Sequence, residues 1–367
     1  MLALSSRNMQ VKMKIPKLQI GNITSDLPII QGAMGVRVSL SSLASAVANE
    51  GGIGAIASVG LGDVEAAKHE YEKMCREALE DEIRKARSLT NGHIAVNVMG
   101  VLSNSKDLVK TIVREGIKII IYGAGLPLKL PPLVEDDSVN LLPIVSSRRA
   151  AELILRLWDR RYSRTADGFI LEGPLAGGHL GFSMEQLKQP ENYSLMNLLP
   201  GVLEVVKKYE DKYARKIPVI TAGGIFDGKD IARMLLAGAS GVQMATRFVC
   251  TEECDVSPKF KQAYLDAKEE DITIINSPVG LPGRAIRNKF LRELDIKGKI
   301  KINCHYRCLT ACNVNEARYC IALALLNACQ GDTSNGLIFC GQNAYRVNKI
   351  VTVRELISEL ISEIKAF

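Results

Sequence analysis

Short runs of apolar residues recur along the chain, and a stretch with helical periodicity follows most of them. The runs are continuous rather than alternating, which is typical of strands buried on both faces of a parallel sheet. Eight such strands are expected, at residues 28–31, 53–58, 94–98, 117–121, 142–146, 168–171, 218–221 and 241–245.

The intervening stretches place apolar residues at helical spacing. Helices are expected at residues 39–49, 63–87, 147–161, 229–237 and 352–365. Eight strand–helix alternations favour an α/β fold of the TIM (β/α)8 barrel type over an open doubly wound sheet. An open Rossmann sheet would need G-x-G-x-x-G directly after its first strand, whereas residues 31–35 read QGAMG.

The character of the sequence changes near residue 295. Residues 1–295 are enough for the barrel, so residues 296–367 are expected to form a Cys-rich helical C-terminal extension. The basic stretch at 296–301 would join the two parts.

Cysteines are concentrated in this extension. If it is helical, Cys304, Cys308 and Cys312 share one face. With Cys320 or Cys340 as a fourth ligand they could bind an iron–sulfur cluster or zinc. The alternative is that these cysteines are small buried residues that pack the extension against the barrel.

Charge and hydropathy exclude several classes of protein. The formal net charge is +7, from 47 basic and 40 acidic residues interspersed along the chain. No basic block with interleaved aromatics points to a nucleic acid, and the mild excess favours anionic ligands. No apolar run reaches the length of a membrane span, and the N-terminus lacks an apolar signal region. A cytoplasmic protein with mostly reduced cysteines is therefore expected.

The last two barrel strands end in residues suited to binding a phosphate. Gly223 and Gly224 follow one strand, and the other ends at Thr246. Glycines let backbone amides approach a phosphate closely, and barrels often bind phosphate at their last two loops. The alternative is that the glycines only make tight turns. The expected site comprises Ala222, Gly223, Gly224, Gln243, Met244, Ala245 and Thr246.

Two earlier strands add further candidates. Gln31, Gly32, Ala33 and Met34 end the first strand, where small residues leave room for a flat ring. Asn97 is a polar residue in an apolar run, so it either bonds the ring edge or caps the following turn.

A glycine-rich loop after the sixth strand carries the catalytic candidate. Residues 172–181 read EGPLAGGHLG. His179 could transfer a proton near neutral pH, or could instead bond a loop carbonyl or a phosphate oxygen. Glu172, Gly177 and Gly178 are expected to contact the cofactor, and Glu172 or Tyr122 is the next choice for proton transfer.

These motifs together resemble the nitronate monooxygenase family, formerly 2-nitropropane dioxygenase, which includes enoyl-acyl carrier protein reductase II. The matching stretches are Gln31–Met34, 123–127, 176–181, 222–225 and 242–248. The resemblance implies a TIM barrel that binds FMN non-covalently near His179. It also implies a small-molecule substrate, and a homodimer is expected.

Within the family two activities remain open. In the first, a nitronate reduces FMN and oxygen completes the turnover. In the second, NADH or NADPH reduces FMN, which then reduces an enoyl thioester. Residues 277–288, here called the fold-back segment, resemble a segment that covers the site in the reductase branch, and they include Arg284 and Arg287. The arginines either bind a phosphate or carboxylate or lie on the surface. The nitronate activity is preferred, because the extension replaces the region expected to recognise a carrier protein. A non-catalytic flavin redox sensor is a third alternative.

Overall fold

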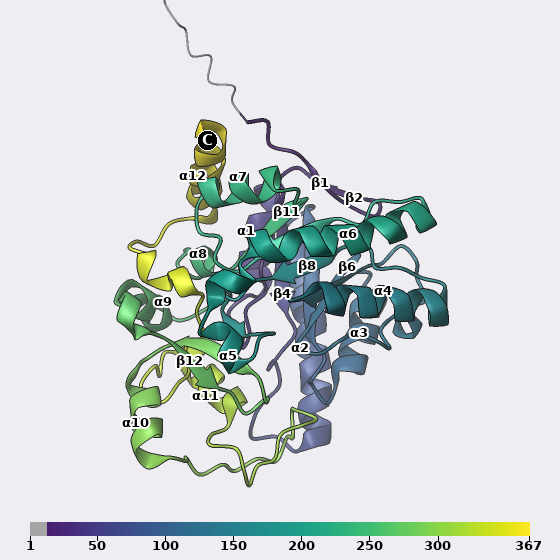
Figure 1. The fold of residues 1–367 in the computed structure, drawn as a ribbon. Coiled ribbons are helices and arrows are strands. Elements are labelled where there is room, and N and C mark those ends of the chain that lie inside the picture. Colours follow the sequence, from purple (N-terminus) through teal and green to yellow (C-terminus); the bar gives the residue numbers. More distant parts are fainter. Residues whose placement is uncertain (1–12) are drawn as a thin grey trace, which may run out of the picture.

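The eight expected strands form one closed parallel barrel in the computed structural model, which describes residues 13–367 (Figure 1). The predicted (β/α)8 barrel is therefore confirmed. Its strands are β3 (Ile29–Gln31), β4 (Ile53–Ala57), β5 (His93–Met99), β6 (Ile119–Gly123), β7 (Asn140–Val145), β8 (Phe169–Glu172), β10 (Val219–Ala222) and β11 (Gly241–Met244).

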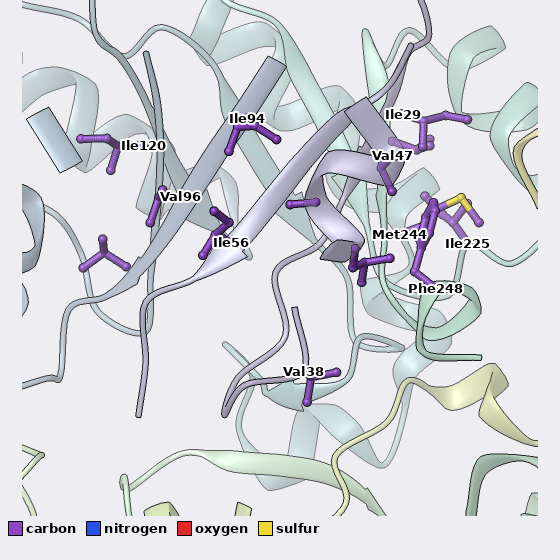
Figure 2. Close-up of a cluster of buried hydrophobic side chains, with 14 of the residues drawn as sticks. Ile29, Val38, Val47, Ile56, Ile94, Val96, Ile120, Ile225, Met244 and Phe248 are labelled. Atoms are coloured by element: carbon purple, nitrogen blue, oxygen red, sulfur yellow. The ribbon is translucent and has the colours of Figure 1, made fainter. Parts of the chain in front are cut away.

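Alternate residues of each strand enter two different apolar cores, because successive side chains point to opposite faces of a strand. Ile30, Ile119 and Ile121 pack inside the barrel. Ile29 and Ile120 point outwards into the larger core beneath the helices, where Figure 2 shows both. Burial on both faces explains why these strands read as continuous apolar runs.

The outer layer consists of helices between the strands. Its members are α1 (Ser41–Asn49), α2 (Lys68–Leu89), α3 (Ser105–Arg114), α4 (Arg148–Tyr162), α6 (Leu195–Tyr213) and α7 (Gly228–Leu236). The helix α12 (Val353–Ala366) packs against α7 and α1, so the C-terminal part of the chain closes this ring. The Glu363 carboxylate accepts a hydrogen bond from the Gly228 amide at 2.7 Å, which fixes α12 beside the first turn of α7.

The N-terminal end of the barrel is plugged by a hairpin. It is formed by β1 (Leu18–Ile20) and β2 (Ile23–Ser25). Leu18, Ile20 and Ile23 are buried in the same cluster as Ile30 and the other side chains of the barrel interior. The opposite end, where the strands finish, is therefore the one left for a site.

Shorter elements cover that opposite end. A three-stranded sheet joins β9 (Gly178–His179), β12 (Ile272–Asn276) and β13 (Pro282–Ile286). The remaining elements are α5 (Met184–Leu187), α8 (Thr246–Val249), α9 (Pro258–Leu265), α10 (Lys289–Lys297), α11 (Ile321–Gln330) and the 3-10 turns η1 (Pro131–Leu133), η2 (Pro190–Tyr193), η3 (Glu269–Asp271) and η4 (Gln342–Arg346). In Figure 1, α10, α11 and β12 lie at the end of the molecule away from β1 and β2.

The prediction of a helix through Cys304, Cys308 and Cys312 is wrong. Residues 298–320 contain neither helix nor strand. The segment is instead held by contacts with the loop after β5. The Ser103 amide donates to the Cys308 carbonyl at 3.0 Å, and the Thr310 amide donates to the Val101 carbonyl at 2.9 Å.

The described residues include no helix that is both long enough and apolar enough to cross a membrane.

Candidate active site

A cavity of about 450 Å³ opens at the carboxyl ends of the barrel strands. His179 lines it, and so do all the expected cofactor-binding residues except Gln31 and Gly32. These are Ala33, Met34, Asn97, Glu172, Gly177, Gly178, Ala222, Gly223, Gly224, Gln243, Met244, Ala245 and Thr246. The structure thus brings together residues from five strands at one place.

Gln31 and Gly32 lie beneath the cavity rather than at its surface. The Gln31 side chain donates to Ser39 Oγ at 3.0 Å and accepts from the Ala55 amide at 2.9 Å. The Gly32 amide donates to the Met244 carbonyl at 2.7 Å. Both residues join neighbouring strands of the barrel, which is a structural role that the motif alone did not distinguish from cofactor binding.

The loop after β10 requires its two glycines. Gly223 and Gly224 have φ angles of +93° and +84°, in the left-handed region that side chains disfavour. A Cβ on Gly223 would come 2.9 Å from the Ala176 amide nitrogen. The loop can therefore lie directly against the glycine-rich loop after β8, and its backbone stays open to a ligand.

Gln243 lines the cavity and carries an unsatisfied polar atom. Among the described residues its Oε1 is buried and has no hydrogen-bond partner. A buried acceptor without a donor costs about 1–3 kcal/mol, so a ligand that donates a hydrogen bond there would relieve the cost. Beside it, Thr246 Oγ1 accepts a hydrogen bond from the Gly341 amide at 3.2 Å.

His179 is held by the fold-back segment. In the antiparallel pair of β9 and β13, His179 lies opposite Gly283. Its Nε2 shares a hydrogen bond of 2.8 Å with Ser277 Oγ, and its ring meets the Phe339 ring edge-on at 5.0 Å. The side chain is partly buried, and desolvation lowers the pKa of His179 to about 4 because the charged ring is poorly solvated. The expected ionisation of His179 near neutral pH is therefore not supported, and the ring is neutral at pH 7.

Glu172 is the group in the cavity that ionises near neutral pH. Burial raises its pKa to about 8, and the nearby positive charge of Arg284 only partly opposes that rise. The carboxyl is therefore largely protonated at pH 7 and can donate a hydrogen bond or a proton into the cavity.

The two candidate arginines have different surroundings. Arg284 is buried and donates to the carbonyls of Pro174, at 2.8 Å, and of Ala176. Its guanidinium therefore fixes the glycine-rich loop from behind. Arg287 is half exposed and pairs with Asp295 at 3.0 Å, so it is a surface residue.

Part of the cavity wall was not expected from the sequence. It is formed by the C-terminal extension and the fold-back segment, which are far from the first barrel strands in sequence but line the same cavity. The residues are Val279, Leu281, Cys308, Leu309, Ile321, Ala322, Leu325, Phe339, Cys340 and Gly341. Only the resemblance of the fold-back segment to a covering segment pointed in this direction. The residues of the extension have no local sequence feature that would have marked them.

The alternative of a metal site in the extension has no support in the structure. Within residues 13–367, no three His, Cys, Asp or Glu side chains are grouped as metal ligands. The cysteines are free thiols. Cys320 Sγ instead shares a hydrogen bond of 2.6 Å with the Tyr306 hydroxyl.

Comparisons with known proteins agree with this geometry. The family profile described as nitronate monooxygenase matches residues 17–114 and 103–363. A probable nitronate monooxygenase of Staphylococcus aureus is 25% identical, over 74% of this chain and 78% of its own. The structure of FabK from Thermotoga maritima has a TM-score of 0.73, with 28% identity over 93% of this chain and 94% of its own.

The name of a further relative describes an enzyme that acts on a coenzyme A thioester. It is the (3aS,4S,5R,7aS)-5-hydroxy-7a-methyl-1-oxo-octahydro-1H-indene-4-carboxyl-CoA dehydrogenase of Mycobacterium tuberculosis. It is 29% identical over 73% of this chain, which spans only 65% of that relative's length. The family profile covers most of the barrel and of the extension, and the chain belongs to the nitronate monooxygenase family.

Proposed function

We propose that the protein is an FMN-dependent oxidoreductase that oxidises nitronates. The observation that carries the proposal is the shared cavity. It is lined both by the glycine loop at Gly223 and Gly224 and by His179. Membership of the nitronate monooxygenase family supports the choice of substrate.

The residues present fit FMN. Gly223 and Gly224 leave backbone free for a phosphate, and Thr246 adds a hydroxyl beside them. The unpartnered Oε1 of Gln243 would accept a hydrogen bond from the ring system. A single phosphate site without a dinucleotide fingerprint favours FMN over FAD. When bound, FMN supplies the redox chemistry, and the protein supplies position and electrostatics.

Two side chains would act on the substrate. His179 is neutral, so it would orient a nitronate by hydrogen bonding rather than by a fixed positive charge. Glu172 is protonated at neutral pH and would hold or deliver a proton close to the reacting atoms. Ser277 would keep the imidazole in place through its hydrogen bond with Nε2.

The second candidate is an NAD(P)H-dependent enoyl-acyl carrier protein reductase. Two observations favour it. The fold-back segment pairs with the glycine-rich loop at the site, and the relative from Mycobacterium tuberculosis is named for a coenzyme A thioester. In this activity NADH or NADPH would be the electron donor.

Anaerobic reduction of the purified protein distinguishes these activities. A nitronate, NADH and NADPH are added in turn, and bleaching of the visible flavin band is followed. Fast bleaching by the nitronate supports the first activity. Fast bleaching by a nicotinamide, reversed by an enoyl thioester, supports the second. No turnover of either substrate would identify a redox sensor and refute both.

The same sample tests the cofactor. Flavin released by heat should co-elute with FMN on chromatography, and recovery of FAD or of no flavin after reconstitution would contradict the proposal. Assembly as a homodimer and a cytoplasmic location stay predictions.

A further inference from the structure

A short stretch of the C-terminal extension contacts three of the loops that line the cavity. It consists of residues 341–346, here called the clasp, and it includes the 3-10 turn η4. The Gly341 amide donates a hydrogen bond to Thr246 Oγ1 at 3.2 Å, just after β11. The Gln342 amide donates to the Leu175 carbonyl at 3.1 Å, in the glycine-rich loop after β8.

Asn343 makes the third contact, with the loop after β10. Its Nδ2 donates a hydrogen bond to the Gly224 carbonyl at 2.7 Å, although the two residues are 119 apart in the chain. Further along the same loop, Arg346 donates to Asp227 Oδ2 at 3.2 Å, and its guanidinium lies 4.1 Å from the centroid of the Phe226 ring. The clasp therefore holds the loop after β10 at more than one point.

Three successive amides of the loop after β10 are available to a ligand. Among the described residues, no backbone carbonyl accepts a hydrogen bond from the amide of Gly223, Gly224 or Ile225. The Phe226 amide, by contrast, donates to the Asp230 carboxylate at 3.0 Å. The first three residues all line the cavity, and successive backbone amides at positive-φ glycines suit an anion such as a phosphate.

The hydrogen bond from Asn343 fixes the direction of one of these amides. The Gly224 carbonyl and the Ile225 amide belong to the same peptide group, in which C=O and N–H point in opposite directions. Because the carbonyl is held towards Asn343, the Ile225 amide is turned away from it. Gly224 is a glycine with φ of +84°, so without this bond the peptide can turn over and present its oxygen instead, which would repel an anion.

We propose that Asn343 is a positioning residue for the cofactor, because it holds the loop at Gly223 and Gly224 in the form that accepts the FMN phosphate. This inference rests on the proposed cofactor, and it gives the C-terminal extension a part in binding it. The described residues that line the cavity include Gly224 but not Asn343. Asn343 therefore acts on the phosphate through the Gly224 carbonyl rather than by contact.

Removal of the Asn343 amide group should weaken the binding of FMN and spare that of riboflavin. Riboflavin has the same ring system and the same sugar chain as FMN, but it has no phosphate. Asn343→Leu has a similar volume and no donor, so the Kd for FMN should rise about tenfold while the Kd for riboflavin stays as in the wild type. The flavin-free full chain is titrated with each flavin, and the change in flavin fluorescence is followed.

Two further variants control for folding and for the chemical change itself. Asn348 is exposed and lies just beyond the clasp, so Asn348→Leu makes the same change away from the loop and should leave both Kd values unchanged. The side chain of serine is too short to reach the Gly224 carbonyl from position 343. If Asn343→Leu does not fold, Asn343→Ser should therefore show the same selective loss of FMN.

The comparison of the two flavins separates this inference from the proposed cofactor. A wild type that prefers FMN to riboflavin, together with an Asn343→Leu variant that loses this preference, supports the inference. Equal weakening of both flavins in the variant would make Asn343 a structural residue, and unchanged Kd values would show that the loop does not need it. Either result overturns the inference and leaves FMN as the cofactor. A wild type that binds both flavins equally well would refute the phosphate site itself, and the inference with it.

Discussion

His179 and Ser277 are 98 residues apart in the chain, yet His179 Nε2 and Ser277 Oγ lie 2.8 Å apart. The contact exists because β13 pairs with β9 and brings the fold-back segment over the glycine-rich loop. The imidazole is thus positioned by a distant segment rather than by its own loop. Substitutions in this region can therefore show whether a residue acts in catalysis or supports the fold.

Replacing His179 by alanine should spare the cofactor and impair turnover. The phosphate is expected at Gly223, Gly224 and Thr246, so the variant should purify with normal flavin content. Its turnover should fall by about 10²–10⁴, the usual value of a positioned acid, base or hydrogen-bonding group. The neutral imidazole is the active form, so the wild-type rate should fall as the pH drops towards about 4. The variant has no imidazole and should not show this fall in rate at acidic pH.

His69 on α2 is the matched control, and His69→Ala should behave like the wild type. Full activity of His179→Ala would make the histidine structural. Loss of flavin from that variant would make it a cofactor ligand.

The carboxyl of Glu172 should make stability depend on pH. Its pKa of about 8 in the folded chain exceeds the ordinary value of 4.5, so the folded state keeps a proton that the unfolded state releases. Stability is therefore lost as the pH rises from 4.5 through about 8. Glu172→Gln should be more stable than the wild type at pH 8.5, on the order of a few kcal/mol at most, and should differ least at acidic pH.

Thermal unfolding of the flavin-free protein at several pH values measures this difference. Glu270→Gln changes an exposed carboxylate and should leave the pH dependence as it is. A Glu172→Gln curve parallel to that of the wild type would show that the carboxyl does not carry a raised pKa.

Gly223→Ala should weaken cofactor binding and stability together. The new Cβ would lie 2.9 Å from the Ala176 amide nitrogen, in a backbone conformation with φ of +93°. We expect destabilisation of about 1–3 kcal/mol and a clear loss of bound FMN. Gly298 has φ of +71° and open space around it, so Gly298→Ala measures the backbone strain alone. Equal flavin content in the two variants would argue against a phosphate site at Gly223.

Arg284→Met should destabilise the chain far more than Arg287→Met. Loss of the buried guanidinium leaves the carbonyls of Pro174 and Ala176 without donors, at a cost of about 2–4 kcal/mol. The Arg287–Asp295 pair is half exposed and should contribute about 0–1 kcal/mol. Denaturant unfolding of both variants measures the difference, and similar midpoints would mean that the glycine-rich loop does not depend on Arg284.

Much of the barrel was predictable because each strand and turn is encoded by a few consecutive residues. Buried parallel strands such as β4 and β10 read as short apolar runs, and the glycines after β10 mark a turn whose positive φ angles favour glycine. Gln31 shows the limit of that reading. A polar residue at a strand end suggests a ligand, but whether its side chain faces the cavity or bonds a neighbouring strand depends on the barrel as a whole.

The extension was harder to predict because distant contacts decide its structure. The spacing of Cys304, Cys308 and Cys312 suits a helix, yet hydrogen bonds with the loop after β5 hold that segment in an irregular form. Phe339 is held at the site by the bridge of its backbone to Ala285 and by the hydrogen bond that its carbonyl accepts from the Tyr264 hydroxyl. No property of residues 304–312 or of Phe339 taken alone encodes those partners.

The position of α12 between α7 and α1 also has a consequence for biosynthesis. The ribosome makes α1 early and α12 only after all eight barrel strands, so the seam between these helices stays open while the rest of the barrel emerges. During that interval the apolar faces that later receive Leu356 and Leu360 are exposed to chaperones and to other nascent chains. Closing the ring therefore removes these apolar faces from contact with other chains.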